Sequence, residues 1–335
     1  MDKFFLVITF SFIICLIISP LIINLVKRLK ARQPLYEYVD MHEKKAGTPT
    51  MGGIIFLIGI ILSSIMFLSG QAKLSVITLG VFFSFGLVGF LDDFLKIKHH
   101  QNLGLKAYQK IIFQLAISII VSIFAYTSPF VGSSIYVPFF NISLNLGWFY
   151  IPFTVVVFLA VTNSVNLTDG LDGLAGGVSL SYLACFAVIF YTIFYKLNIL
   201  NVSPLLLEEY HNLFFVIGSS IGALLAYLLF NSFPAKIFMG DTGSLALGGL
   251  IACVSIFTKQ TLLIPILGIM FVVSSVSVIL QVVKFKLTKK RMFLMAPFHH
   301  HLEKKGMHET KIVAIYIIVT IMVGVVCEVL QIIFF

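Results

Sequence analysis

The chain is poor in charge, because only 11% of its 335 residues are Asp, Glu, Lys or Arg, whereas 59% are hydrophobic. An ordinary soluble domain carries about 25% charged residues. This scarcity excludes a soluble globular protein. Apolar runs of about 20 residues, long enough to cross a bilayer, recur along the whole sequence. We therefore expect an all-α integral membrane protein, a polytopic bundle of about ten transmembrane helices.

The expected spans cover roughly residues 4–26, 51–69, 74–91, 110–127, 148–164, 174–195, 212–230, 245–257, 261–283 and 311–333. We expect them to form a single transmembrane domain over residues 1–335. The loop 128–147 alternates loosely between apolar and polar residues, which predicts a short hairpin.

Cysteine is also scarce, with four residues that each lie alone in an apolar run: Cys15, Cys185, Cys253 and Cys327. No pair has the spacing of a redox motif or of a metal site, so we interpret them as small core or lipid-facing residues.

Acidic residues are outnumbered, 14 against 23 lysines and arginines. Most of the basic residues lie in the linkers after the first, third and ninth spans, which are therefore expected on the cytoplasmic side, with both termini outside. A basic membrane face suits anionic lipid headgroups and phosphorylated substrates. There is no separate basic domain, so nucleic acid is not an expected partner.

The linker at residues 231–245, NSFPAKIFMGDTGSL, places Asp241 between two glycines at the mouth of two apolar runs. A bare carboxylate there is costly unless a partner neutralises it. Asp241 is therefore a candidate ligand for a hard cation such as Mg²⁺, which prefers oxygen ligands and substrate phosphates. An ordinary helix N-cap is the alternative.

The third span ends in two adjacent carboxylates, Asp92 and Asp93. Neighbours on a helix point about 100° apart, so we expect different roles for them, one toward the reacting group and the other toward a cation or a lysine. The alternative is a solvated helix end, although acidic residues there oppose the helix dipole. Lys106 and Lys110 then lead into the next span.

The linker after the fifth span carries Asp169 and Asp172 but no basic residue. Their spacing of three would place both on one helical face. They are candidate partners for a cation, a lysine or a sugar hydroxyl, and the alternative is a tight glycine turn with capping aspartates.

Two further polar motifs lie on the expected cytoplasmic side. Residues 44–53 are basic and glycine-rich at a span's start, which indicates either an anion site or a plain basic anchor. His299, His300 and His301 form an internal run with no second Cys/His cluster to complete a zinc site. Imidazoles close to phosphate, neutral or protonated, are the preferred interpretation, and a solvated histidine run is the alternative.

These clusters would converge at one membrane face. Aspartates gathered with lysines and histidines suit metal-assisted phosphoryl transfer, in which Mg²⁺ and lysine offset diphosphate charge while an acceptor attacks in line. A secondary transporter, the alternative of another class, predicts mid-span ionisable residues and an internal repeat. The sequence has almost none of the former and no visible repeat.

The sequence closely resembles the phospho-N-acetylmuramoyl-pentapeptide transferases of bacteria, within the polyprenyl-phosphate N-acetylhexosamine-1-phosphate transferase superfamily. The resemblance covers essentially the whole chain. It rests on KAGTPTMGG at 45–53, FLDDFLK at 90–96, NLTDGLDGLAGG at 166–177, NSFPAKIFMGDTGSLALGG at 231–249 and APFHHHLEKKG at 296–306. The histidine motif favours this branch over the transferases that use UDP-N-acetylglucosamine, which remain the alternative.

The resemblance implies transfer of phospho-N-acetylmuramoyl-pentapeptide from its UDP carrier to undecaprenyl phosphate in the bacterial cytoplasmic membrane, giving lipid I and UMP with Mg²⁺, often by a homodimer. Asp241 would be the metal ligand, and the implied catalytic residues are Asp92, Asp93, Asp241 and His299. The implied and candidate substrate-binding residues are Lys45, Thr50, Lys106, Lys110, Asn166, Asp169, Asp172, Asn231, Phe238, Gln281, His300 and His301.

The sequence leaves open whether the lipid phosphate attacks in one step or whether an aspartyl intermediate forms first. One-step attack is the working hypothesis, because the lipid phosphate is already an anionic nucleophile that Asp92 need only position or deprotonate.

Overall fold

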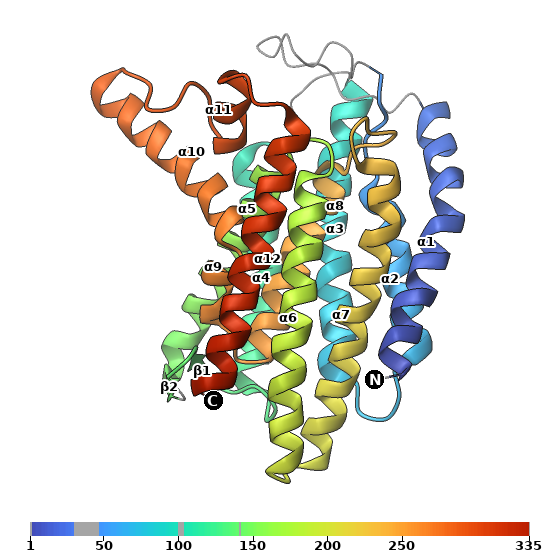
Figure 1. Cartoon of the computed structure of the whole chain (residues 1–335), viewed down its shortest axis with the longest axis vertical. Helices are drawn as coiled ribbons and strands as arrows, with labels where there is room; N and C mark the ends of the chain where they lie inside the picture. The colour runs from blue at the N-terminus through green and yellow to red at the C-terminus, as the bar shows by residue number, and fades with distance from the viewer. Residues whose placement is uncertain (1, 30–46, 100–103, 141, 335) are drawn as a thin grey trace.

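The computed structural model describes residues 2–29, 47–99, 104–140 and 142–334. Its long helices run side by side in one bundle (Figure 1). They are α1 (Asp2–Arg28), α2 (Gly53–Phe67), α3 (Lys73–His99), α4 (Ala107–Thr127), α5 (Tyr150–Thr168), α6 (Leu174–Ile199), α7 (Pro204–Asn231), α8 (Gly240–Phe257), α10 (Ile269–Thr288) and α12 (Glu309–Phe334).

The shorter elements lie at the two ends of the bundle or within its wall. They are the strands β1 (Ser134–Val137) and β2 (Ile142–Asn145), the 3₁₀ turns η2 (Gly147–Phe149) and η3 (Thr261–Leu263), and the helices α9 (Ile264–Leu267) and α11 (Phe298–Lys304). The strands pair antiparallel with Ser134 opposite Asn145, which confirms the expected hairpin.

Within the described residues, nine helices are long and apolar enough to cross a membrane, which confirms an all-α polytopic protein. The expected span at 51–69 corresponds to α2, whose 15 residues extend over about 22 Å and so fall short of a bilayer core. The ninth expected span is divided, because α9 ends and α10 begins on either side of Gly268. Beyond this break α10 leans away from the bundle (Figure 1).

Helix α8 lies at the centre of the bundle, with 89% of its span buried. Small residues let neighbouring helices come close to it. A Cβ added at Gly53 of α2 would overlap the backbone of Gly243, and one at Gly89 of α3 would overlap the carbonyl of Asp241. This close approach fixes the start of α8 against the end of α3.

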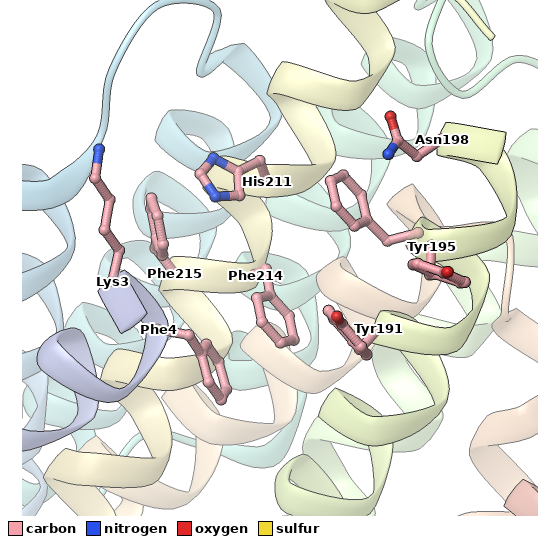
Figure 2. A pocket seen from close by; sticks show the side chains of 9 residues that line it. Lys3, Phe4, Tyr191, Tyr195, Asn198, His211, Phe214 and Phe215 are labelled. Carbon is pink, nitrogen blue, oxygen red and sulfur yellow. The ribbon is translucent and has the colours of Figure 1, made fainter. Parts of the chain in front are cut away.

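Both chain ends lie at one end of the bundle together with the hairpin, whereas α11 lies at the other (Figure 1). A cavity of about 210 Å³ lies near the N-terminus between α1, α6 and α7, where Phe4, Tyr191 and Phe214 line it beside Lys3 and His211 (Figure 2). No acidic residue lines this cavity among the described residues, so it is separate from the aspartate cluster described next.

Candidate active site

Three carboxylates meet where α3 ends and α8 begins. Asp92 and Asp93 lie in the last turns of α3, and Asp241 lies in the first turn of α8. One oxygen from each lies within 4.8 Å of the others, and Asp92 and Asp93 are each only 3% exposed. The sequence prediction that these residues share one site therefore agrees with their positions.

Two lysines bind this cluster. Lys96 Nζ lies 2.6 Å from Asp92 Oδ2, 3.0 Å from Asp241 Oδ2 and 3.9 Å from Asp93 Oδ1. Lys110 Nζ, from the start of α4, donates to Asp241 Oδ2 at 2.8 Å. Three carboxylates thus face two ammonium groups, so negative charge is in excess and a further cation is favoured.

Lys96 was absent from the sequence-derived site residues. The signal was present, because a lysine three and four positions after two aspartates on a helix lies on their side of it. Its contact with Asp241, 145 positions away, depends on the packing of α3 against α8 and has no local signal.

Asp93 caps the start of α8. Its Oδ1 accepts the Asp241 N–H at 3.1 Å, and its Oδ2 accepts the Thr242 N–H at 2.9 Å and the Thr242 hydroxyl at 2.7 Å. The free N–H groups and the dipole at a helix start stabilise such a carboxylate. Asp93 therefore orients the residue that carries the next carboxylate of the cluster.

Asp92 has different partners from its neighbour. Its Oδ1 accepts the Leu105 N–H at 2.8 Å, which draws the start of the α4 segment over the cluster. Its Oδ2 forms an ion pair with Lys96 that is not a well-directed hydrogen bond. Asp92 thus keeps an oxygen that can turn toward a cation or a substrate.

Asn166, near the end of α5, joins the cluster from a third side. Its Nδ2 donates to Asp241 Oδ1 at 2.7 Å and to Ser244 Oγ at 2.8 Å. Helices α3, α4 and α5 therefore all hold Asp241, with the two lysines on its Oδ2 and Asn166 on its Oδ1.

Asp169 and Asp172 do not share a helical face, so that expectation is wrong. Helix α5 ends at Thr168 and α6 begins at Leu174, so both aspartates lie in the glycine-rich turn between the two helices. Asp172 Oδ2 accepts the Ala235 N–H at 2.9 Å and is 4% exposed.

Asp169 faces the carboxylate cluster. Burial raises its pKa well above the usual value, and the negative charges of Asp241 and Asp93 raise it further. A carboxyl group in this setting is stabilised by a cation when it is ionised, and it can donate a hydrogen bond to an acceptor when it is protonated.

Two predicted substrate-binding amides are bonded to the backbone. Asn231 accepts from Gly173 N–H at 3.2 Å and donates to the Ile237 carbonyl at 2.9 Å. Gln281 accepts from Met292 and Phe293 N–H, both at 2.9 Å, and donates to the Phe293 carbonyl at 3.2 Å. Both amides therefore shape loops at this end of the bundle.

The segment that opens α2 pairs with the segment before α8. Phe238 N–H donates to the Pro49 carbonyl, and Gly52 N–H donates to the Phe238 carbonyl, both at 2.8 Å. Thr50 is buried close to Gly240, where an added Cβ would lie 2.9 Å from its hydroxyl. Thr50 and Phe238 thus lie beside the cluster. Lys45 lies outside the described residues, and Lys106 is exposed just before α4.

The three histidines lie on α11 in different surroundings. His299 is 0% exposed, and neither ring nitrogen has a hydrogen-bond partner among the described residues. Burial lowers its pKa to about 3, so the imidazole is neutral at physiological pH. A Cβ at Gly170 would overlap its Nε2, which places it against the turn that carries Asp169. It is enclosed rather than open to a substrate.

His300 Nδ1 lies 3.0 Å from Glu303 Oε2, and His301 Nδ1 accepts the Leu294 N–H at 3.1 Å. That hydrogen bond keeps His301 neutral at Nδ1, and burial together with Lys305 lowers its pKa. The run therefore fixes the loop after α10, and His300 lies beside the α5–α6 turn, because a Cβ added at Gly170 would lie 3.0 Å from its Nε2.

Oxygen donors from carboxylates, with amide and hydroxyl groups behind them, fit a hard divalent cation and do not fit zinc or copper. The cluster as a whole could neutralise and orient a diphosphate through Lys96 and Lys110, and a cation held by the aspartates would supply further positive charge.

Comparison with known proteins agrees with this geometry. The family profile described as Glycosyl transferase family 4 matches residues 74–259, and the pattern described as phospho-N-acetylmuramoyl-pentapeptide-transferase signature 1 matches residues 45–57. A phospho-N-acetylmuramoyl-pentapeptide-transferase of Clostridium perfringens (strain 13 / Type A) is 45% identical over 320 residues, 95% of this chain and 96% of that protein.

Proteins with the same description from Clostridium novyi (strain NT) and Clostridium kluyveri (strain NBRC 12016) are each 44% identical over 312 residues. These matches cover 93% of this chain, and 91% and 94% of the respective relatives. Similarity of this extent includes every helix that contributes to the carboxylate cluster.

Proposed function

The chain belongs to the phospho-N-acetylmuramoyl-pentapeptide-transferase family, and from that premise we propose that it transfers phospho-N-acetylmuramoyl-pentapeptide from UDP to undecaprenyl phosphate. An oxygen of the lipid phosphate attacks the sugar-bearing phosphorus of the donor, and the bond from that phosphorus to the bridging oxygen breaks. UMP leaves, and the product is lipid I. The observation that carries the proposal is the carboxylate–lysine cluster at the α3–α8 contact.

We propose Mg²⁺ as the cofactor. Asp241 would be its principal ligand, because Asn166 and the two lysines orient its two oxygens. Asp92, which has an oxygen within 4.8 Å of one of Asp241, would be a second ligand. When bound, Mg²⁺ supplies positive charge to the diphosphate oxygens as the bridging bond breaks.

The chain's own residues perform the remaining tasks. Lys96 and Lys110 offset charge on the departing UMP phosphate, and Asp92 positions the lipid phosphate or takes its proton. Asp93 keeps α8 oriented, so its effect on the reaction passes through Asp241. One-step attack remains our hypothesis, and a covalent phosphosugar trapped on Asp92 without acceptor lipid would overturn it.

The nucleotide and sugar-peptide parts of the donor are assigned to the loops around the cluster. Thr50 and Phe238 flank the start of α8, and Lys106 lies at the entrance to α4. We assign Lys45, which lies outside the described residues, to the same part of the donor. Asn166 and Asp169 face the diphosphate, whereas Asp172, Asn231 and Gln281 hold the loops that bind the donor.

The α11 histidines are assigned to the sugar-peptide side. His300 and His301 are partly exposed, and His300 lies beside the α5–α6 turn that carries Asp169. His299 is a positioning residue in our proposal, because it is enclosed against the α5–α6 turn beside Asp169.

The chain is a multi-pass membrane protein. We place it, as one transmembrane domain, in the bacterial cytoplasmic (inner) membrane with its active site on the cytoplasmic face and both termini outside, and we expect a homodimer. The positions of the chain ends, opposite α11 and its basic neighbours, support this orientation (Figure 1).

The test uses membranes that contain the full chain, undecaprenyl phosphate and either UDP-N-acetylmuramoyl-pentapeptide or UDP-N-acetylglucosamine as donor. We expect Mg²⁺-dependent release of UMP and formation of lipid I with the first donor. Turnover with the second donor alone would assign the chain to the N-acetylglucosamine branch, and no turnover with either would refute the transferase proposal.

A further inference from the structure

The hairpin at the opposite end of the bundle exposes an uncovered apolar surface. Residues 128–149 contain no Asp, Glu, Lys, Arg or His. Five large apolar side chains in the second half of this segment are exposed, with Trp148 at 75% and Phe140 at 69%. We call them the hairpin patch, which consists of Phe140, Ile142, Leu144, Trp148 and Phe149.

The strand register separates an apolar face from a polar face. Ile135 pairs with Leu144 and Val137 pairs with Ile142, so these four side chains lie on one side of the ribbon. Ile135 is 4% exposed and packs into the core, whereas Ile142 and Leu144 continue the same face outward without cover. The hairpin is therefore amphipathic, and only half of its apolar face is used inside the protein.

The polar face is occupied locally. Asn145 Oδ1 accepts the Ser133 hydroxyl at 2.7 Å and the Gly147 N–H at 2.9 Å, which fixes the turn into η2. Tyr136 N–H donates to the Lys259 carbonyl at 2.9 Å and ties the hairpin to the turn after α8. The patch is thus held in a defined place on the bundle.

The patch is continuous with a surface that faces lipid. Trp148 and Phe149 lie in η2, which leads directly into α5 at Tyr150, and the apolar run that crosses the membrane there begins at Gly147. On α5 and α4 the outward side chains Val156 and Ile120 are exposed to 63% and 70%. An apolar patch that adjoins a lipid-facing wall is most simply covered by the same lipid.

We propose that the hairpin patch is a membrane-interface anchor that lies in the headgroup layer of the phospholipid bilayer. Uncharged segments rich in Trp and Phe, with hydroxyl and amide groups beside them, suit this layer, where the rings contact acyl chains and the polar groups remain wet. A separate protein partner is disfavoured because the patch has no charged rim to orient one.

The anchor acts on α5. It holds the end of this helix that begins at Tyr150, and the opposite end supplies Asn166 to Asp241. Since a helix is a stiff rod, fixing one end at the bilayer surface sets the depth of the other end. The inference goes beyond the proposed function and does not depend on it.

Trp148 is the only tryptophan of the chain, so intrinsic fluorescence reports on the patch alone. The full chain is reconstituted in phosphatidylcholine–phosphatidylglycerol vesicles, with and without lipids brominated at known chain depths. We expect blue-shifted emission, weak quenching by aqueous acrylamide, and quenching that is strongest for bromine near the headgroups.

Two reference variants calibrate the depth scale in a Trp148→Phe background. Ile120→Trp reports from the outward face of α4, where deep bromines should quench most, and Lys290→Trp reports from an exposed loop where acrylamide should quench most. Trp148 should fall between them.

A matched pair tests the two faces of β2. Leu144→Glu on the apolar face should reduce bromolipid quenching of Trp148 at least threefold, whereas Ser143→Glu on the polar face should leave it within about 20%. Trp148 quenched by acrylamide like Lys290→Trp would overturn the proposal. Protection of Trp148 from both acrylamide and bromolipid would also overturn the proposal, because it would indicate that protein covers the patch. If that protection increased with the number of chains per vesicle, the covering protein would be a second copy of this chain.

Discussion

Two pairs of adjacent acidic residues lie at opposite ends of the bundle. At the end with the termini, Glu209 Oε1 accepts the Lys73 N–H at 3.0 Å and its Oε2 accepts the Leu74 N–H at 2.8 Å, so it caps α3. At the other end, Asp93 caps α8 in the same way. One member of each pair therefore has a structural task that explains its burial.

The second members differ. Glu208 is exposed and accepts the Gln71 N–H at 3.2 Å, whereas Asp92 is buried beside Asp93, Asp241 and Lys96. Burying a carboxylate beside two others is costly unless cations join them. Capping therefore explains two of the four acids, and exposure to solvent explains Glu208. Asp92 is the one whose position requires a ligand or a reaction.

The largest expected effect comes from removing the metal ligand. Asp241→Asn keeps the shape of the side chain but loses its charge, and metal-assisted charge stabilisation of about 4 kcal/mol corresponds to roughly a thousandfold in rate. We expect UMP release to fall by about that factor, while Glu209→Gln at the other end retains activity within about threefold. Equal losses of UMP release in Asp241→Asn and Glu209→Gln would contradict the proposal that only the end of the bundle with Asp241 takes part in the reaction.

The two caps can be compared directly. Asp93→Asn and Glu209→Gln each remove the charge from a buried cap, so each should lower the free energy of unfolding by about 1–3 kcal/mol. Only Asp93→Asn should also lower kcat, because α8 carries Asp241. Thermal unfolding in detergent and UMP turnover measure the two effects. A Glu209→Gln variant with the larger loss of kcat would contradict the division of roles.

The two lysines of the cluster should contribute unequally. Lys96 contacts all three carboxylates and Lys110 contacts only Asp241. We expect Lys96→Met to lower kcat/KM by about a hundredfold and Lys110→Met by about tenfold. Initial rates against donor concentration test this order, and a more severe Lys110→Met variant would refute it.

A third buried ionisable group extends the comparison to acid stability. The pKa of His299 is about 3 in the folded chain against 6.5 when unfolded, so the unfolded chain binds the extra proton between these values. The contribution of His299 to the free energy of unfolding is therefore complete above pH 6.5 and is lost as the pH falls toward 3. The loss amounts to at most roughly 5 kcal/mol.

His299→Asn should flatten that part of the pH dependence. The midpoint of thermal unfolding, measured from pH 8 to pH 4, should fall less steeply in the variant than in the unmodified chain. Identical slopes would mean that His299 is already charged or solvated in the folded protein.

The smallest effect is expected at the exposed acid. Glu208→Gln should change the free energy of unfolding by less than about 0.5 kcal/mol and leave turnover unchanged, because water solvates this carboxylate in both states. Urea or thermal unfolding measures it. A loss as large as that of Glu209→Gln would show that both members of this pair are structural.

The fold was largely predictable from sequence, because apolar runs of bilayer length have few alternatives to helices. The differences between the predicted and observed helices lie in where individual helices begin, end or break. Helix α7 begins at Pro204, eight positions before the expected span, because Glu209 is neutralised by backbone N–H groups of another helix. The break at Gly268 and the shortness of α2 likewise depend on packing.

The candidate site was predictable in its members but not in their tasks. Asp92, Asp93 and Asp241 stand out because carboxylates are rare beside apolar runs. That Asp93 caps α8, that Asn231 accepts from Gly173 and that Lys96 also reaches Asp241 follow from contacts between distant segments. Spacing in the chain contains no information about those contacts.

The most direct test of the account is metal binding itself, measured by Mn²⁺ electron paramagnetic resonance on the purified full chain. We predict one site per chain that Mg²⁺ displaces, lost in Asp241→Asn, weakened in Asp92→Asn and intact in Glu209→Gln. Equal Mn²⁺ binding in all variants would contradict the assignment of the α3–α8 carboxylates as the cation site.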